Sequence, residues 1–284
     1  MTLNNLYKQI VYHLSEVATD EAKTIAYLLL EHYTSYGKLF VCLNPDTDVD
    51  DVLVEKINEA VRELQHHRPI QYVLGETVFC GLRFMVNESV LIPRQETEEL
   101  VSWILEESSP SSTLLDICTG SGCIAIALAN VLKNKVYAID LFEKTLETAQ
   151  KNATLNGVDI HFMQKDVLSA DFGTDINELF DVIVSNPPYV RESEKQYMHQ
   201  RVLNFEPREA LFVEDKDPLL FYRKILEFGK SHLKDNGKIF FEINETFGEE
   251  IVDLFSQYGY KDIVLRKDIH NKNRMVRGKV VISD

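Results

Sequence analysis

From residue 93 onward, apolar strand patterns alternate with amphipathic helix patterns, and this alternation restricts the fold more than any other feature of the chain. Five segments have the pattern of strands, namely 113–118, 135–140, 160–166, 180–186 and 237–243. Because helical patterns separate them, we predict an α/β fold with a doubly wound, parallel sheet. Two final strand patterns, at 261–267 and 275–281, predict a mixed edge to that sheet.

The first part of the chain has a different pattern. Residues 1–75 carry apolar residues at helical spacing, clearest over 48–64, which predicts a small N-terminal helical bundle domain. Over 70–92 the apolar residues alternate and glycines intervene, which suggests short strands. We therefore assign 76–92 as a β-hairpin linker and 93–284 as the second domain.

The net charge of −15 bears on the partners of this protein. Nucleic-acid binders usually carry a basic surface, because neutralised phosphates supply most of their non-specific affinity. Local basic strips such as 266–279 could contact RNA, but such a strip is more typical of a solvated strand edge. We therefore expect a protein or small-molecule partner and no direct nucleic-acid binding.

Neither a membrane segment nor a metal site is expected. No stretch approaches 18 uninterrupted apolar residues, and the amphipathic N-terminus lacks a signal-peptide layout, which favours a cytoplasmic protein. Cys118 and Cys123 flank a glycine turn, but no cluster of histidines or further cysteines accompanies them.

The glycine turn CTGSG, at 118–122, follows the first strand of the α/β region. Such a turn lets a ligand approach the backbone closely at the start of the next helix. The absence of a third glycine and of a following lysine disfavours a dinucleotide or P-loop phosphate site. The stretch instead resembles the S-adenosylmethionine loop of Rossmann-like methyltransferases, and the candidate loop residues are Cys118, Thr119, Gly120, Ser121 and Gly122.

Two acidic residues end the next two strands. Asp140 follows the glycines by about twenty residues, the spacing at which an acid accepts hydrogen bonds from ribose hydroxyls. Asp166 ends the third strand, where it or the adjacent backbone can meet an adenine amine. Because the carboxyl ends of parallel strands share one edge of a sheet, we expect these residues to lie around one ligand.

The fourth strand ends in VSNPPYV, at 184–190. Two consecutive prolines stop the strand and hold the chain in a stiff exit. Asn186 and Pro187 then offer a side-chain oxygen and a backbone carbonyl, which can accept both N–H bonds of a planar amine or amide and stabilise positive charge on its nitrogen. Tyr189 can pack over the flat group. The motif resembles that of amino-methyltransferases, whose planar nitrogens need no strong general base.

Several blocks of the chain occur in the order and spacing of the HemK/PrmC family: RPIQYVLG (68–75), IPRQETEELV (92–101), LDICTGSG (115–122), SNPPYV (185–190) and NFEPREAL (204–211). The resemblance covers nearly the whole chain. It implies a Rossmann-like class I S-adenosylmethionine-dependent methyltransferase domain that follows a small helical domain. Two roles are open for the helical domain, docking of the release factor and a passive role in folding. The implied activity is methylation of the glutamine side chain in the GGQ loop of peptide-chain release factors, with S-adenosylhomocysteine as product and translation termination as the process affected.

The resemblance also assigns roles to residues. On the cofactor side it implies the 118–122 loop and Asp140 on the ribose, with Val167 at a position that is often aromatic in the family. On the substrate side it implies the NPPY block, which consists of Asn186, Pro187, Pro188 and Tyr189. Asn186 is expected to face the cofactor as well.

The chain departs from the family pattern at four positions. Gln95 replaces the second proline of PRPETE, and Val167 removes a possible adenine stack. Asn244 and Phe247 stand where relatives often have the glycine and the glutamine of EIGxxQG. In the PRQETE stretch we expect Thr97 to cap the following helix and the stretch also to line the cleft.

Two other functions are compatible with parts of this pattern. An adenine or guanine amino-methyltransferase of nucleic acids would share the NPPY block, although the negative charge counts against it. A non-enzymatic scaffold could bind the cofactor and the GGQ domain without methyl transfer, although an intact NPPY block argues against it.

Overall fold

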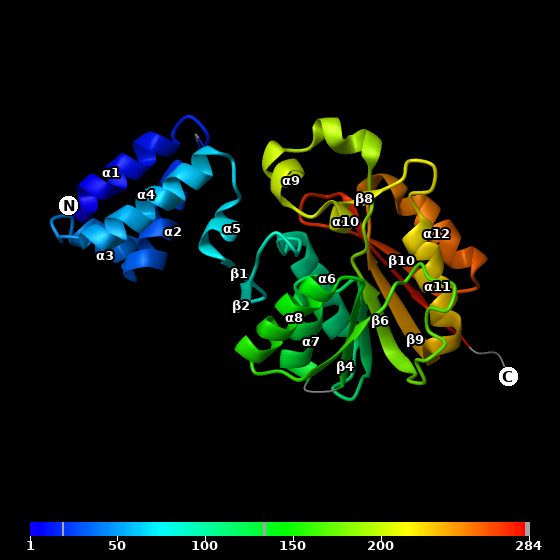
Figure 1. Cartoon of the computed structure of the whole chain (residues 1–284). Coiled ribbons are helices and arrows are strands. Elements are labelled where there is room, and N and C mark those ends of the chain that lie inside the picture. Colours follow the sequence, from blue (N-terminus) through cyan, green and yellow to red (C-terminus); the bar gives the residue numbers. More distant parts are fainter. Residues whose placement is uncertain (19, 133–134, 282–284) are drawn as a thin grey trace. The chain divides into compact units, whose positions relative to one another are not determined.

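The computed structural model describes residues 1–18, 20–132 and 135–281, and the chain divides into two compact units (Figure 1). The first unit consists of Met1–Glu76 together with His199–Phe205, and the second of Thr77–Met198 together with Glu206 onward. Each unit has its own hydrophobic core.

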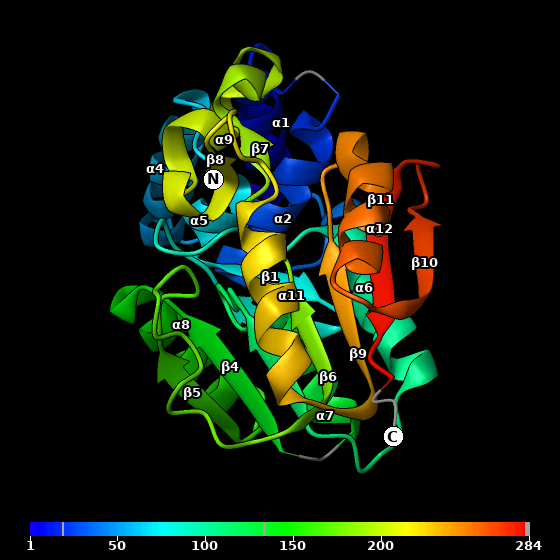
Figure 2. The ribbon, with the colours of Figure 1, turned by 90° about the vertical axis from the view of Figure 1, so that its right-hand side faces the viewer.

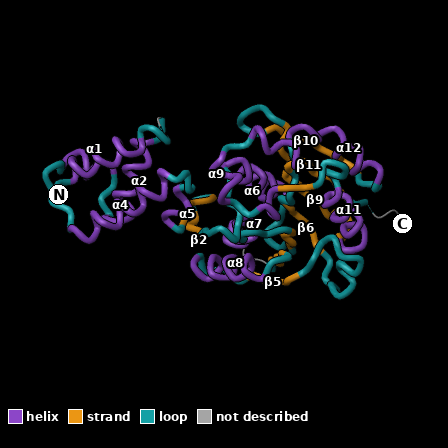
Figure 3. Tube along the Cα trace, turned by 45° about the horizontal axis from the view of Figure 1, so that its top comes forward, coloured by secondary structure: helices purple, strands orange, loops and turns teal. Residues whose placement is uncertain are grey.

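The first unit is helical, as predicted (Figure 3). Its helices are α1 (Leu3–Leu14), α2 (Ala22–Thr34), α3 (Lys38–Leu43), α4 (Asp51–Gln65) and α5 (Ile70–Leu74). Fully buried side chains such as Leu6, Leu29 and Ile57 pack between α1, α2 and α4. Short strands were expected from residue 70, but α5 forms there because Pro69 precedes it and Gly75, at φ +74°, ends it.

One segment from far along the sequence belongs to the first unit. Residues 199–205 contain α9 (Gln200–Phe205), and the Arg201 guanidinium donates to Val17 O at 3.0 Å and to Glu21 Oε2 at 3.1 Å. The prediction placed 93–284 in one continuous domain. In the structure, residues 199–205 interrupt that domain and pack with the N-terminal helices.

The second unit is built on a seven-stranded sheet in the order β10-β11-β9-β6-β3-β4-β5. The strands are β3 (Leu114–Ile117), β4 (Val136–Asp140), β5 (Ile160–Gln164), β6 (Phe180–Ser185), β9 (Leu233–Glu242), β10 (Lys261–Lys267) and β11 (Asn273–Lys279). The run from β9 to β5 is parallel, and β11 and β10 add an antiparallel edge. The predicted α/β fold with a mixed edge is confirmed.

Helices cover both faces of this sheet. On one face lie α6 (Gln95–Glu107), α7 (Cys123–Leu132) and α8 (Glu143–Leu155), around a core that includes the buried Trp103. The other face carries α11 (Leu220–His232) and α12 (Gly248–Gln257) (Figure 2). These helices pack on it through residues such as Tyr222 and Phe255. The chain goes from β3 to β4 and β5 on one side, whereas β6 lies on the other side of β3, so the order of the parallel strands reverses between β3 and β6.

The predicted hairpin is present but forms part of the second unit. β1 (Glu76–Phe79) and β2 (Leu82–Met85) form a two-stranded sheet, and Phe79 and Phe84 are buried in the same core as α6 and α7. Asn152 on α8 accepts the Met85 amide at 2.6 Å and donates to its carbonyl at 3.0 Å. The hairpin is therefore anchored to the sheet unit.

Between β6 and α11 the second unit contains a small parallel pair, β7 (Val190–Arg191) with β8 (Phe212–Val213), and two short helices, η1 (Glu192–Tyr197) and α10 (Arg208–Leu211). No helix in the described part of the chain is long and apolar enough to cross a membrane.

Candidate active site

A cavity of about 660 Å³ lies at the carboxyl ends of the parallel strands, within the second unit. Residues that follow β3, β4, β5 and β6 line it, and it therefore lies at the switch point of the sheet. Its volume is within the range of small-molecule sites. Apolar side chains such as Ile117, Ile139 and Phe221 supply much of the wall.

The loop after β3 contributes four of its five predicted residues to the cavity wall: Cys118, Thr119, Gly120 and Ser121. Left-handed conformations alternate along the loop, with φ of +63° at Cys118, +56° at Gly120 and +80° at Gly122. Gly122 is not a lining residue. A Cβ there would lie 3.0 Å from Ile126 Cδ1 and 3.2 Å from Ala149 Cβ, so its contribution is close packing of the loop on α7 and α8.

Asp116, inside β3, is hydrogen-bonded to this loop and to the start of α7. Its Oδ2 accepts the Thr119 hydroxyl at 2.6 Å and the Ala125 amide at 3.3 Å, while Oδ1 has no partner among the described residues. Burial raises the pKa of this carboxyl to about 7. No role of Asp116 was predicted from the sequence, although an acidic residue within the apolar run TLLDIC is an unusual feature that could have indicated one.

The two acids predicted at strand ends both line the cavity. Asp140 is tied to the loop, because its Oδ2 accepts the Gly120 amide at 2.9 Å and its Oδ1 accepts the Phe142 amide at 3.2 Å. Burial raises the pKa of Asp140. Asp166 is more exposed and accepts the Leu168 amide at 2.8 Å, and Val167 beside it is a buried part of the wall.

The NPPY block divides between the cavity and the protein interior. Asn186 and Pro188 line the cavity, and no hydrogen bond links the Asn186 side chain to any other described residue. Ser185, just before it, donates to Ile117 O at 2.6 Å and so joins the end of β6 to the end of β3. Pro187 is buried and not among the lining residues.

Tyr189 does not line the cavity either. Its hydroxyl donates to Glu242 Oε1 at 3.1 Å, and burial beside that carboxylate raises the pKa of the phenol. The expectation that Tyr189 packs over a flat substrate group therefore differs from the observed position, in which the ring packs with the core beneath α11 and the hydroxyl is engaged inside the protein.

The PRQETE stretch lines the cavity with Pro93, Arg94 and Thr97. Thr97 was expected to cap α6, but this is wrong, because the helix already begins at Gln95. Instead the Thr97 hydroxyl donates to Glu242 Oε2 at 2.6 Å. The contact between Thr97 and Glu242 could not be predicted from the local sequence around either residue.

The NFEPREAL block is joined to PRQETE by a buried carboxylate. Glu206 accepts Arg94 Nη2 at 2.5 Å and the Ile92 amide at 3.3 Å, with only 1% of its side chain exposed. Pro207, Glu209 and Ala210, which follow it, line the cavity.

Comparison with known proteins identifies the family. The model of the PrmC N-terminal domain matches residues 5–75, and that of the Methyltransferase small domain matches residues 95–212. The Release factor glutamine methyltransferase of Flavobacterium psychrophilum is 47% identical over 284 residues, which cover 98% of this chain and 99% of that protein. This chain belongs to the release factor glutamine methyltransferase family. The protein of the same name from Bacteroides thetaiotaomicron is 41% identical over 260 residues, covering 90% and 92% of the two chains.

A solved structure supports the fold of this family member. The crystal structure of a methyltransferase from Pyrococcus furiosus aligns with a TM-score of 0.55 at 19% identity, covering 79% of this chain and 99% of that one. The second unit is thus a class I methyltransferase domain, and the protein is a methyltransferase.

The four residues that differ from the family pattern lie in different parts of the second unit. Gln95 is the first residue of α6, a position that also suits proline, and Val167 presents an aliphatic wall to the cavity. Asn244 caps η2 (Glu245–Phe247) by accepting the Thr246 amide at 3.0 Å. The Phe247 ring centroid lies 5.1 Å from the Arg191 guanidinium carbon.

Proposed function

We propose that this protein transfers a methyl group from S-adenosylmethionine to the side-chain amide nitrogen of the glutamine in the GGQ motif of peptide-chain release factors, and so modulates translation termination. The observation that carries the proposal is the Asn186 side chain, which lies on the cavity wall beside the glycine loop with its amide unengaged by other described residues. An amide group in this position is free to bind another planar amide.

The lining residues of the cavity suit S-adenosylmethionine. A Cβ at Gly120, which lines the cavity, would meet no described atom within 4 Å, so the backbone there is open to a ligand. Ile117, Ile139 and Val167 offer an apolar surface for adenine. In this proposal the 118–122 loop holds the methionine part of the cofactor.

The remaining cofactor contacts are assigned to the two strand-end acids. Asp140 would accept the ribose hydroxyls, and Asp166 or its adjacent backbone would accept the adenine amine. The bound cofactor supplies an electrophilic methyl group on a sulfonium. Asn186, at the junction, would face both cofactor and substrate.

Groups of the NPPY block would orient the side-chain amide of the substrate glutamine and polarise it. The Asn186 side-chain oxygen, on the cavity wall, would accept a hydrogen bond from one N–H group of the amide and turn its nitrogen toward the methyl group. The second N–H group is assigned to the backbone carbonyl of Pro187, a residue that does not itself line the cavity in this structure. The same two acceptors stabilise the positive charge that develops on nitrogen, and the stiffness of Pro187 and Pro188 keeps them in place.

A labelling experiment tests the substrate assignment. With tritiated S-adenosylmethionine we expect label on a release factor, and none on the same factor after replacement of its GGQ glutamine by alanine. The alternative, a nucleic-acid amino-methyltransferase, predicts label on DNA or RNA. Label on nucleic acid and none on the release factor would refute the proposal; the net charge of −15 favours the protein substrate.

For the first unit we propose that it helps to dock the release factor. Hydrogen exchange of residues 1–75 should slow when a release factor is added. Slowing confined to the second unit would contradict this role.

A further inference from the structure

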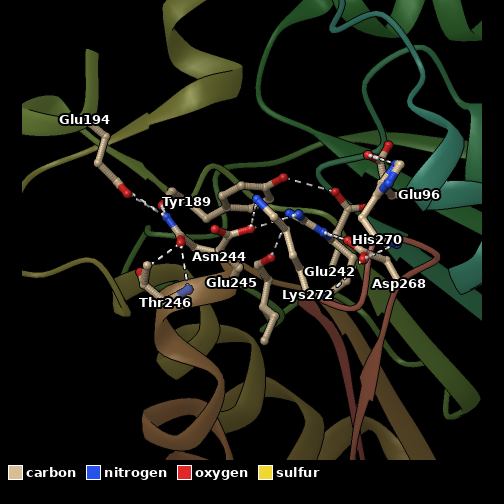
Figure 4. Close-up of polar contacts among 12 residues, drawn as sticks. Glu96, Tyr189, Glu194, Glu242, Asn244, Glu245, Thr246, Asp268, His270 and Lys272 are labelled. Carbon is tan, nitrogen blue, oxygen red and sulfur yellow. Dashed lines mark hydrogen bonds and ion pairs between the residues drawn. The ribbon is translucent and has the colours of Figure 1, made fainter. Parts of the chain in front are cut away.

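Tyr189 is held at two points, by Glu242 at the end of β9 and by Asn244 two residues later. Its hydroxyl donates to Glu242 Oε1 at 3.1 Å, and its carbonyl oxygen accepts Asn244 Nδ2 at 3.2 Å (Figure 4). β9 runs parallel to β6 with Phe241 opposite Ser185. Glu242 and Asn244 therefore lie beside the point at which the chain leaves β6 through the NPPY block.

Glu242 joins two motifs that are far apart in the sequence. Its side chain is buried, with one oxygen on Tyr189 and the other, Oε2, accepting the Thr97 hydroxyl at 2.6 Å. Thr97 lines the cavity, whereas Tyr189 does not. A buried carboxylate is stable only when its oxygens are satisfied, so both hydroxyls are constrained to point toward it.

Asn244 is itself fixed in orientation. Its Oδ1 accepts the amide of Thr246 at 3.0 Å and the hydroxyl of Thr246 at 2.8 Å, which leaves Nδ2 facing Tyr189 and Glu194 (Figure 4). Nδ2 lies 3.2 Å from Glu194 Oε2, and the same oxygen accepts the Arg191 amide at 2.8 Å. Asn244 thereby ties the segment after NPPY to the end of β9.

We infer that Glu242 and Asn244 are positioning residues for the methyl-transfer site, and that Tyr189 transmits their effect to Asn186. This inference rests on the proposed function. Between Asn186 and Tyr189 there are only two prolines, whose φ angles are fixed, so a tyrosine held at both ends limits the orientations open to Asn186. The observed role of Tyr189 is then to hold the block, in place of contact with the substrate.

The structure contains a matched control for this role. Tyr222 on α11 is fully buried, whereas Tyr189 is partly buried, and the Tyr222 hydroxyl donates to the backbone carbonyl of Glu242 at 3.1 Å. Tyr189→Phe and Tyr222→Phe therefore each remove one hydroxyl that donates a hydrogen bond to Glu242. Only the first hydroxyl belongs to the NPPY block.

The experiment compares the two variants in methylation of a release factor. Because a misplacement of about 1 Å can cost 100-fold in rate, we expect Tyr189→Phe to lower kcat roughly 10- to 100-fold. The dissociation constant for S-adenosylmethionine should change less than about twofold, since the cofactor contacts are untouched. Tyr222→Phe should lower the Tm by a similar amount as Tyr189→Phe while kcat stays near the wild-type value.

A second measurement needs no turnover. Asn244→Asp keeps the acceptor for Thr246 but loses the donor to Tyr189 and places a carboxylate beside Glu194. Hydrogen exchange in peptides that cover 187–198 should then become faster, whereas Tyr222→Phe should leave it unchanged.

These arms separate failure of the inference from failure of the proposed function. If the wild type does not methylate release factors, the proposed function fails, and the exchange experiment still tests whether Asn244 holds this segment. If the wild type is active but Tyr189→Phe keeps its kcat, or Tyr222→Phe loses as much, the inference is overturned. Unchanged exchange in Asn244→Asp would also overturn it.

Discussion

The buried carboxyl of Asp116 should make the stability of the second unit depend on pH, and Asp116→Asn should remove that dependence. Asp116 lies inside β3 with 1% of its surface exposed, and its Oδ2 holds the Thr119 hydroxyl and the Ala125 amide. An asparagine oxygen can accept the same two bonds. The substitution therefore changes the charge and leaves the loop anchored.

The size of the effect follows from burial. The pKa of Asp116 rises from 3.8 in the unfolded chain to about 7 in the folded protein, chiefly because burial disfavours its charged form, with a smaller effect from the nearby Asp140. Between these values folding takes up a proton, so the free energy of unfolding falls as pH rises, by up to about 1.4 kcal/mol per pH unit. Over the whole window the loss is of the order of 4 kcal/mol, and above about pH 7 it stays constant.

Urea unfolding from pH 5 to pH 8 measures this dependence. Trp103 is the only tryptophan and is buried in the second unit, so its fluorescence reports that unit alone. As pH rises, the free energy of unfolding should fall in the wild type and not in Asp116→Asn. The variant should therefore become more stable relative to the wild type between pH 5 and pH 8. Asp159→Asn, at an exposed position of the same unit, is the control and should run parallel to wild type. Parallel curves for Asp116→Asn would show that Asp116 does not hold a proton, which refutes the reasoning.

Three further substitutions test the site. Asp140→Ala should weaken S-adenosylmethionine binding by about 10- to 100-fold, since each hydrogen bond to a charged group contributes roughly 1.5–3 kcal/mol; an unchanged dissociation constant by calorimetry would exclude the ribose role. Gly122→Ala should lower the Tm more than Gly259→Ala, because both have φ near +80° but only Gly122 is also crowded by neighbouring side chains; equal losses would contradict this. Glu206→Gln should cost about 2 kcal/mol of stability by leaving Arg94 without its buried partner, and a change below about 0.5 kcal/mol in denaturant unfolding would mean that the pair is not structural.

Much of the fold was predictable because strand and helix patterns have different periods. The seven strands of the sheet lie where the apolar patterns placed them, apart from shifts at their ends. The largest shift is in β9, which begins at Leu233 because that residue pairs with Phe180 across an irregularity, so the polar residues 234–236 are included. Local periodicity carries no information on such cross-strand pairing.

The positions of the site residues were predictable to the extent that they depend on strand ends. Asp140 and Asn186 face one cavity because parallel strands end at the same edge of the sheet. The contacts of Glu242 with Thr97 and Tyr189 were not predictable, since they join residues 145 and 53 positions apart through side chains alone. The prediction that Thr97 caps α6 was wrong for a local reason, because the helix begins two residues earlier, at Gln95.

The most direct test of the proposed function is mass spectrometry of the GGQ peptide after incubation of a release factor with S-adenosylmethionine and either wild-type protein or Asn186→Ala. The wild type should add one methyl group to the glutamine, and fragmentation should place it on the side-chain amide. Asn186→Ala should add none while its affinity for S-adenosylmethionine remains within a few-fold of wild type, because Asn186 orients the substrate amide. A GGQ peptide left unmethylated by the wild type, or fully methylated by Asn186→Ala, would contradict the account.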